Sequence, residues 1–375
     1  MHTERNNYHY FFFAVILLIG DIMKKIILLI LLLMPLNIRA TSTIAYDMDT
    51  HQILYSANIY DKRSVASISK IMTAILACES GKLDDIVEIG DEINKAYGSG
   101  IYISEGEHLT LRDLVYGLML RSGNDASLSI AKYVGKTVET FVDLMNQKAK
   151  EIGMVDTIFN NPNGLDLDGG NISTAYDMAL LTSYAMKNDE YKKITSTKKY
   201  TLKTDMNYYS WINKNKLLFS YKYTTGGKTG FTKIAKRTLV TTASNNNMNV
   251  VIVTLNDGND FLDHKKLYEK IFKEYKGYDI LKAGDITVAN FKDKSAYYIN
   301  EGFKYDLNNA DKDKISVKLE LNDQINEDYI GKIYVYLDNK KLYTTNVYIN
   351  HNKKVTFWQK IKFLLSGNKD VGNIW

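Results

Sequence analysis

The stretch SISKIMTAILACESG, residues 67–81, places a serine and a lysine at the head of an apolar helical pattern. Apolar residues recur at helical spacing from Ile68 to Leu76, and Ser80-Gly81 supplies a glycine stop. The pattern predicts a buried amphipathic helix with Ser67 at its start. On that helix Ser67 and Lys70 are one turn apart, so both side chains project from the same face.

This pair of residues suits nucleophilic chemistry. A serine hydroxyl is a weak nucleophile at neutral pH and needs a base within hydrogen-bond distance. Lys70 can be that base if burial and neighbouring positive charge lower its pKa towards neutrality. Backbone N–H groups at the start of a helix also favour a developing oxyanion. The alternative is that Ser67 only caps the helix while Lys70 reaches solvent.

A second short motif, Ser122-Gly123-Asn124, falls in a polar break between two helical patterns. A loop at such a break can face a cleft. There the Ser122 hydroxyl would relay a proton between Lys70 and a leaving amine, and Asn124 would hydrogen-bond Lys70 and the substrate backbone. The alternative is a simple helix break in which Asn124 or Asp125 is the N-cap.

A third motif, Lys228-Thr229-Gly230, occurs once, at the start of strand-like sequence. A glycine lets a substrate backbone lie close alongside a strand. Lys228 would supply positive potential, and Thr229 a hydroxyl for a substrate carboxylate. The Ser-x-x-Lys pattern recurs elsewhere by chance, so the order and spacing of the three motifs carry the inference.

The segment from 41 to 276 predicts an α+β domain in which helices pack on an antiparallel sheet. Two short apolar runs on either side of a polar turn at 47–52 predict a hairpin at its start. Helical patterns and then strand-like runs follow. The predicted helices cover 111–120, 126–134, 138–152 and 174–186, and the predicted strands cover 237–243 and 250–255.

After about residue 277 the pattern changes to strict alternation. Apolar and polar residues alternate in 315–321 and 333–337, which predicts half-buried strands, and 342–349 predicts another. Residues 277–350 therefore predict a small all-β domain. In the tail, 351–375, an apolar helical stripe with flanking lysines predicts a helix that lies on a membrane surface. The alternative is a terminal helix that docks on the body of the protein.

Residues 1–40 have the pattern of an export signal. Met23-Lys24-Lys25 precedes an apolar run at 26–34. This run is too short to cross a bilayer of about 30 Å as a helix, which favours a signal peptide cleaved after Ala40. A second apolar run lies upstream, and we interpret Met23 as the start of translation. The alternative is a longer, uncleaved N-terminus that acts as an anchor.

The composition excludes several classes of protein. The chain has 375 residues, is 45% hydrophobic and carries a net charge of +5. It can therefore bury a sizeable core, and two domains are expected. Basic and acidic residues are interleaved, so no basic stripe predicts nucleic-acid binding. The only cysteine, Cys78, excludes an intramolecular disulfide and lies in an apolar helical pattern, where a buried, unreactive thiol is expected.

In this order, Ser-x-x-Lys, Ser-x-Asn and Lys-Thr-Gly are motifs of penicillin-sensitive serine acyl-transfer sites. Their surroundings resemble the D-alanyl-D-alanine carboxypeptidases among the low-molecular-weight penicillin-binding proteins. The resemblance is strong over 41–263 and looser in the β-rich segment and the tail. The matching blocks are RSVASISKIMTA at 63–74, NDA at 124–126, FNNPNGL at 159–165, STAYD at 173–177 and KTGFT at 228–232.

The resemblance implies a β-lactamase/penicillin-binding-protein-like transpeptidase domain followed by a small all-β domain, at the extracytoplasmic face of the cell membrane. It also implies that Ser67 attacks the bond between the two terminal D-alanines of a peptidoglycan stem peptide. D-Alanine leaves, and water hydrolyses the acyl-enzyme. Penicillins and other β-lactams would acylate the same serine, with no cofactor or metal required.

The resemblance also assigns a role to each matched residue. Lys70 would be the base, Ser122 the relay and Asn124 a positioning residue. Lys228 and Thr229 would bind the terminal carboxylate of the substrate, next to Gly230. The N–H groups of Ser67 and Phe231 would form the oxyanion hole.

The chain departs from the family pattern at three places. Many relatives have a histidine before the Ser-Thr-Ala block, where this chain has Asn171-Ile172, and a small Ala-Gly pair where it has Ala235-Lys236-Arg237. Relatives often place an arginine near the position of 259–263, but this segment has none. The departures put a second cationic contact to the substrate carboxylate in doubt.

Three other functions remain open. A class A β-lactamase deacylates with a glutamate after the second motif, whereas 160–173 contains Asp166 and Asp168 and no glutamate. A D,D-endopeptidase or transpeptidase acting on cross-links would use the same chemistry. A non-catalytic envelope binding module with a decayed site is the third alternative. Substrate release separates these functions in part: a carboxypeptidase frees D-alanine from a pentapeptide, an endopeptidase cuts only dimers, and a binding module does neither.

Overall fold

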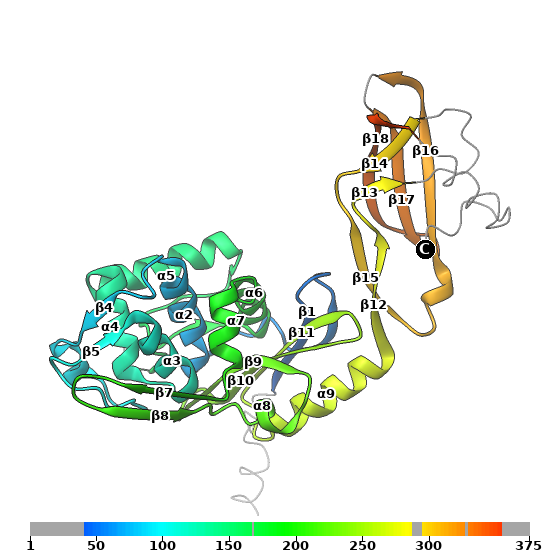
Figure 1. Cartoon of the computed structure of the whole chain (residues 1–375). Helices are drawn as coiled ribbons and strands as arrows, with labels where there is room; N and C mark the ends of the chain where they lie inside the picture. The colour runs from blue at the N-terminus through cyan, green and yellow to red at the C-terminus, as the bar shows by residue number, and fades with distance from the viewer. Residues whose placement is uncertain (1–40, 167–168, 287–294, 327–328, 355–375) are drawn as a thin grey trace, which may run out of the picture. The chain divides into compact units, whose positions relative to one another are not determined.

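The computed structural model describes residues 41–166, 169–286, 295–326 and 329–354 (Figure 1). The predicted export signal at 1–40 and nearly all of the predicted membrane-binding tail, from residue 355 on, lie outside these ranges. None of the helices in the described ranges has the length and hydropathy that a membrane span needs.

The region from residue 41 to 274 is built on a five-stranded sheet. Its strand order is β2-β1-β11-β10-β9, and every neighbouring pair is antiparallel. The predicted N-terminal hairpin is confirmed, because β1 and β2 pair directly. The strands are β1 (Ser42–Asp47), β2 (Ile53–Ala57), β9 (Thr224–Thr232), β10 (Lys236–Asn245) and β11 (Met248–Leu255).

Helices cover this sheet, and the four predicted from 111–120, 126–134, 138–152 and 174–186 are confirmed. The helix predicted from Ser67 begins three residues later, at Lys70, because a 3-10 turn, η1 (Ala66–Ser69), precedes it. The helices are α2 (Lys70–Glu79), α3 (Leu111–Arg121), α4 (Asn124–Gly135), α5 (Val138–Ile152), α6 (Ala175–Ala185), α7 (Asp189–Ser196), α8 (Leu217–Ser220) and α9 (Asp260–Glu274).

The sheet separates two apolar cores. Ile44 and Val253 point into a large core that they share with α2 to α7. Their neighbours Ala45 and Ile252 point to the other face, where α9 packs on them. This alternation follows from the period of two along a strand. The helix that carries Lys70 is therefore buried between the sheet and the other helices.

The connecting segments of this region contain short strand pairs and a 3-10 turn. The strand pairs are β3 (Arg63–Ser64) with β6 (Ile172–Ser173), β4 (Ile86–Glu88) with β5 (His108–Thr110), and β7 (Lys199–Lys203) with β8 (Tyr208–Ile212). A second 3-10 turn, η2 (Asp91–Lys95), precedes the loop that reaches the candidate site.

The C-terminal region contains β-strands, as the alternating pattern predicts, and a 3-10 turn, η4 (Lys312–Lys314). Its five-stranded sheet has the order β13-β14-β18-β17-β16, and β12 pairs with β15. The strands are β12 (Tyr275–Leu281), β13 (Gly284–Ile286), β14 (Ser295–Ile299), β15 (Phe303–Asn308), β16 (Ile315–Asn326), β17 (Tyr329–Leu337) and β18 (Lys340–Lys354). Together these regions form the predicted α+β architecture with a β-rich C-terminal part.

Candidate active site

Ser67 lies in the turn η1, half-buried and therefore reachable from solvent. The preceding residue, Ala66, has a left-handed backbone with φ of +51°, a conformation that costs energy for a residue with a Cβ. The Ser69 hydroxyl donates a hydrogen bond of 2.8 Å to the Ala66 carbonyl and holds the turn. Gly164 packs against this turn, and only a glycine fits there, because a Cβ at this position would lie 2.0 Å from that carbonyl oxygen. Tight packing thus presents the Ser67 hydroxyl in one direction.

Lys70 is fully buried, and its Nζ lies 3.0 Å from the Ser67 Oγ. The same Nζ donates to the Asn124 side-chain oxygen at 2.7 Å and to the Asn163 carbonyl. Burial, with the positive charge of Lys214, lowers the pKa of Lys70 to about 7. A neutral amine in this position can accept the hydroxyl proton of Ser67, which is the condition for general-base catalysis.

The second motif lies where α3 ends and α4 begins. Asn124 is the first residue of α4, and its side chain bonds both Lys70 and the Tyr97 carbonyl. Ser122 follows α3 in a left-handed conformation and is almost fully buried. Within the described residues its hydroxyl makes no hydrogen bond to Ser67 or Lys70. The structure therefore brings Asn124 to Lys70, the predicted base, whereas Ser122, the predicted relay, makes no hydrogen bond to Lys70 within the described residues.

The third motif lies inside β9, the strand at the edge of the sheet. Lys228 is buried, and burial, together with the charges of Lys70 and Lys214, lowers its pKa well below the ordinary lysine value. A Cβ on Gly230 would lie 3.0 Å from the backbone nitrogen of Ser67, so only a glycine lets this strand approach the turn η1 so closely. Phe231, the next residue, is exposed.

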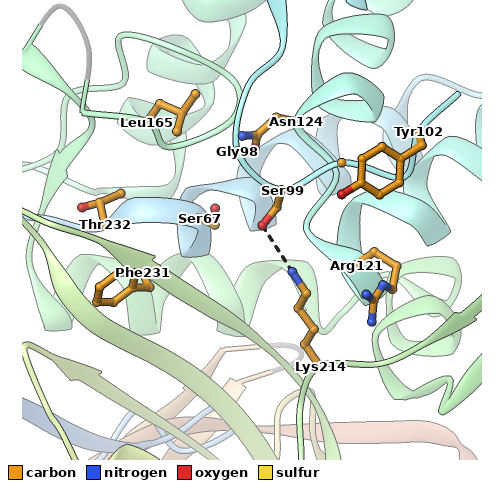
Figure 2. A pocket seen from close by; sticks show the side chains of 11 residues that line it. Ser67, Gly98, Ser99, Tyr102, Arg121, Asn124, Leu165, Lys214, Phe231 and Thr232 are labelled. Atoms are coloured by element: carbon orange, nitrogen blue, oxygen red, sulfur yellow. Dashed lines mark hydrogen bonds between the residues drawn. The ribbon is translucent and has the colours of Figure 1, made fainter. Parts of the chain in front are cut away.

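A pocket of about 400 Å³ opens in front of Ser67 (Figure 2). Of the predicted site residues, it is lined by Ser67, Asn124 and Phe231. Its other walls were not predicted as site residues from the sequence, although Leu165 and Thr232 end two of the matching blocks. They are formed by Gly98, Ser99, Gly100, Tyr102, Arg121, Leu165, Lys214 and Thr232.

The side chain of Asn171 holds the loop behind Lys70. Its oxygen accepts hydrogen bonds from the backbone N–H groups of Asn160 and Asn161. Its side-chain nitrogen donates back to the Asn161 carbonyl at 2.9 Å. This loop carries the Asn163 carbonyl, which accepts from Lys70. Asn171 is therefore a buried polar anchor for the loop.

No group of three or more His, Cys, Asp or Glu side chains in the described ranges is arranged to hold a metal ion. The chemistry that this site offers is that of a serine hydroxyl, a lysine amine and a strand edge. A sheet covered by helices, with these groups around one pocket, defines the class of β-lactamase/penicillin-binding-protein-like serine acyl-transfer proteins.

Comparisons with known proteins identify the family within this class. The family model described as D-alanyl-D-alanine carboxypeptidase, peptidase family S11, matches residues 32–259. The chain is 33% identical over 264 residues to the D-alanyl-D-alanine carboxypeptidase DacF of Bacillus subtilis. The aligned region covers 68% of this chain and 67% of the relative. It is 32% identical over 286 residues to DacC of Escherichia coli, and the aligned region covers 71% of this chain and 70% of the relative.

A solved structure with a similar fold is penicillin binding protein 5 from Haemophilus influenzae. It has a TM-score of 0.72 and 26% identity, and the match covers 84% of this chain and 98% of that one. The chain belongs to the D-alanyl-D-alanine carboxypeptidase family. It is a serine-type D-Ala-D-Ala carboxypeptidase.

Proposed function

We propose that Ser67 is the nucleophile and Lys70 the base in removal of the terminal D-alanine from peptidoglycan stem pentapeptides. The observation that carries this assignment is the 3.0 Å contact between the Lys70 Nζ and the Ser67 Oγ, with the pKa of Lys70 lowered to about 7. Lys70 takes the hydroxyl proton as the Ser67 oxygen bonds to the carbonyl carbon. The C–N bond then breaks, and the leaving amine takes up a proton.

The remaining residues act on the substrate in this proposal. Asn124 positions Lys70 and the substrate backbone, and Ser122 passes the proton to the leaving amine. Lys228 and Thr229 bind the terminal carboxylate, and Gly230 lets the peptide lie along the edge of β9. The N–H groups of Ser67 and Phe231 stabilise the oxyanion. Water then hydrolyses the acyl-enzyme, and β-lactams acylate the same serine.

The test is the intact mass of the Thr41–Trp375 protein, followed over time after mixing with a penicillin. We expect a lasting adduct on the parent protein and none on Ser67→Ala, with D-alanine release from a stem pentapeptide lost in the same variant. Labelling of Ser67→Ala would contradict the assignment of the nucleophile. Rapid drug hydrolysis without an adduct would favour a β-lactamase, and cleavage of cross-linked dimers alone would favour an endopeptidase.

Export and membrane attachment are a further part of the proposal, supported by the sequence patterns at 1–40 and 351–375. The enzyme would then act at the outer face of the cell membrane, where its substrate is located. We expect removal of 355–375 to release the protein from sedimented membranes, with the full chain as the control. A truncated protein that still sediments would point to an uncleaved N-terminus as the anchor.

A further inference from the structure

Helix α7 lies beside β9, the strand that carries the third motif (Figure 1). Thr195, in the last turn of α7, is 1% exposed. The Gly227 N–H donates to the Thr195 Oγ1 at 2.9 Å, and the same hydroxyl donates to the Gly227 carbonyl at 3.2 Å. One side chain therefore satisfies both backbone groups of the residue that precedes Lys228.

This contact occupies a defined place on the free edge of the sheet. The pairing of β9 with β10 is regular over 226–232. In an antiparallel strand the N–H and C=O of one residue point to the same side, and the side alternates from residue to residue. Because Gly227 points away from β10 towards Thr195, Thr229 and Phe231 present their backbone groups to the same free edge. The Thr195 hydroxyl thus closes one end of the row of backbone groups with which a substrate peptide could pair.

Two glycines allow this close approach of α7 to β9. A Cβ on Gly226 would lie 2.5 Å from the Thr195 Cγ2, and a Cβ on Gly227 would lie 2.2 Å from the Val240 carbonyl oxygen. Gly227 also has a φ of +140°, a conformation that favours glycine. The Gly226-Gly227 pair in front of the motif therefore lets α7 and β10 pack tightly on the two sides of the strand.

The backbone of Gly227 depends on the Thr195 hydroxyl. Both of their hydrogen bonds are buried. A buried backbone group without a partner is costly, so loss of the hydroxyl would force the strand to shift. Lys228 follows directly and is itself 1% exposed, so a shift at Gly227 is passed on to a side chain that has little free space around it.

We propose that Thr195 is a positioning residue for the third motif, whose hydroxyl fixes the place of Lys228 and of the free edge of β9 against the substrate. This inference rests on the proposed function, because it assumes that the stem peptide binds along this edge. Thr195 is not among the residues that line the pocket in front of Ser67, so it acts through Gly227 and not by contact with the substrate. It sets the end of the edge, and with it the register of the peptide.

The experiment compares Thr195→Val, which has nearly the same shape but no hydroxyl, with Thr195→Ser, which keeps the hydroxyl. Release of D-alanine from a stem pentapeptide gives KM and kcat for the wild type and both variants. We expect Thr195→Val to raise KM by about tenfold, with a smaller change in kcat, because a misplaced edge weakens substrate binding. Thr195→Ser should keep the KM of the wild type.

Thr182→Val is the matched control. Thr182 is also a 1% exposed threonine, and its hydroxyl donates to the Met178 carbonyl of its own helix. This variant should lose stability in chemical denaturation but keep the KM of the wild type. If Thr195→Val does not fold, Thr195→Cys replaces it with the same expected rise in KM, because a thiol is only a weak hydrogen-bond donor.

Three results would overturn the proposal. The first is a wild-type KM in the variant that lacks the hydroxyl, and the second is an equal rise in KM in Thr195→Ser. The third is an equal rise in Thr182→Val, which would mean that KM follows stability alone. A wild type that releases no D-alanine would contradict the proposed function itself, so the two failures are distinguishable.

Discussion

The catalytic region and the C-terminal strands bury different kinds of side chain. Around Ser67 the interior holds two fully buried lysines, Lys70 and Lys228, with asparagine side chains and carbonyl groups as neighbours. The C-terminal core cluster consists of aliphatic side chains and one tyrosine, among them Ile333 and Val335. The first arrangement holds groups that can react, and the second is an apolar core.

The difference has an energetic origin. Burial of an ammonium group is costly unless it is paired, and the protein lowers the cost by shifting the pKa. Among the described residues, Lys70 and Lys228 have no carboxylate at hydrogen-bond distance. The burial of these two amines therefore costs free energy that the apolar cores must supply. Substitutions in the catalytic region should therefore change activity most, and those in the C-terminal strands should change stability alone.

The largest effect is expected for Lys70→Arg. Arginine keeps the positive charge and donates hydrogen bonds but does not give up its proton, so it cannot act as the base. Acylation by penicillin should slow by at least about a hundredfold, which is typical for loss of a general base. In the wild type the acylation rate should fall as the pH drops below about 7, because protonated Lys70 cannot accept the Ser67 proton.

Stopped-flow acylation across pH 5 to 9 measures both effects, with Lys216→Arg as a control for the change of side chain. Near-normal acylation by Lys70→Arg would assign the base to another group. A wild-type rate that does not vary through this pH range would show that deprotonation of Lys70 does not control the step.

A smaller effect is expected for Gly230→Ala, which tests how closely β9 must approach the nucleophile. The new Cβ would lie 2.3 Å from the Thr238 Oγ1, and that hydroxyl donates to the Val65 carbonyl just before the turn. The turn must shift, and we expect acylation to slow by about tenfold to a hundredfold, as for misplaced catalytic groups. Gly258→Ala is the matched control, because nothing lies within 4 Å of its Cβ position. Equal rates in both variants would contradict the close-approach argument.

The two regions also differ in what their sequences reveal. Alternation over 315–321 predicted β16, and the apolar period of 3.6 predicted α3 to α6, because these patterns are local. The strand β9 was predicted only at its motif. Its residues are mostly glycine and threonine, which show no apolar alternation, and it is held in the sheet by its pairing with β10. The hairpin β7–β8 and the helix α9 were missed.

The candidate site shows the same limit. The motifs predicted Ser67 and Lys70 as site residues from the sequence alone, since the chemistry needs those residue types at that spacing. Lys214 could not be found in this way, because contacts to residues 195–197 and 226, distant in the sequence, bring it to the pocket. Arg121 also lines the pocket, and its position next to Ser122 is the one local signal that could have pointed to it.

The smallest effect is expected for Ile333→Val, a substitution in the C-terminal core cluster. Ile333 is 1% exposed, so removal of one methylene should lower the free energy of unfolding by about 0.5–1.5 kcal/mol. Ile71→Val is the matched change in α2, next to the base, at a residue that is 0% exposed. It should cost a similar amount of stability but also slow acylation, because it disturbs the helix that carries Lys70. Chemical denaturation gives the first quantity and penicillin acylation the second. If Ile333→Val slowed acylation as much as Ile71→Val, the two regions would be energetically coupled and the separation of chemistry from scaffold would be wrong.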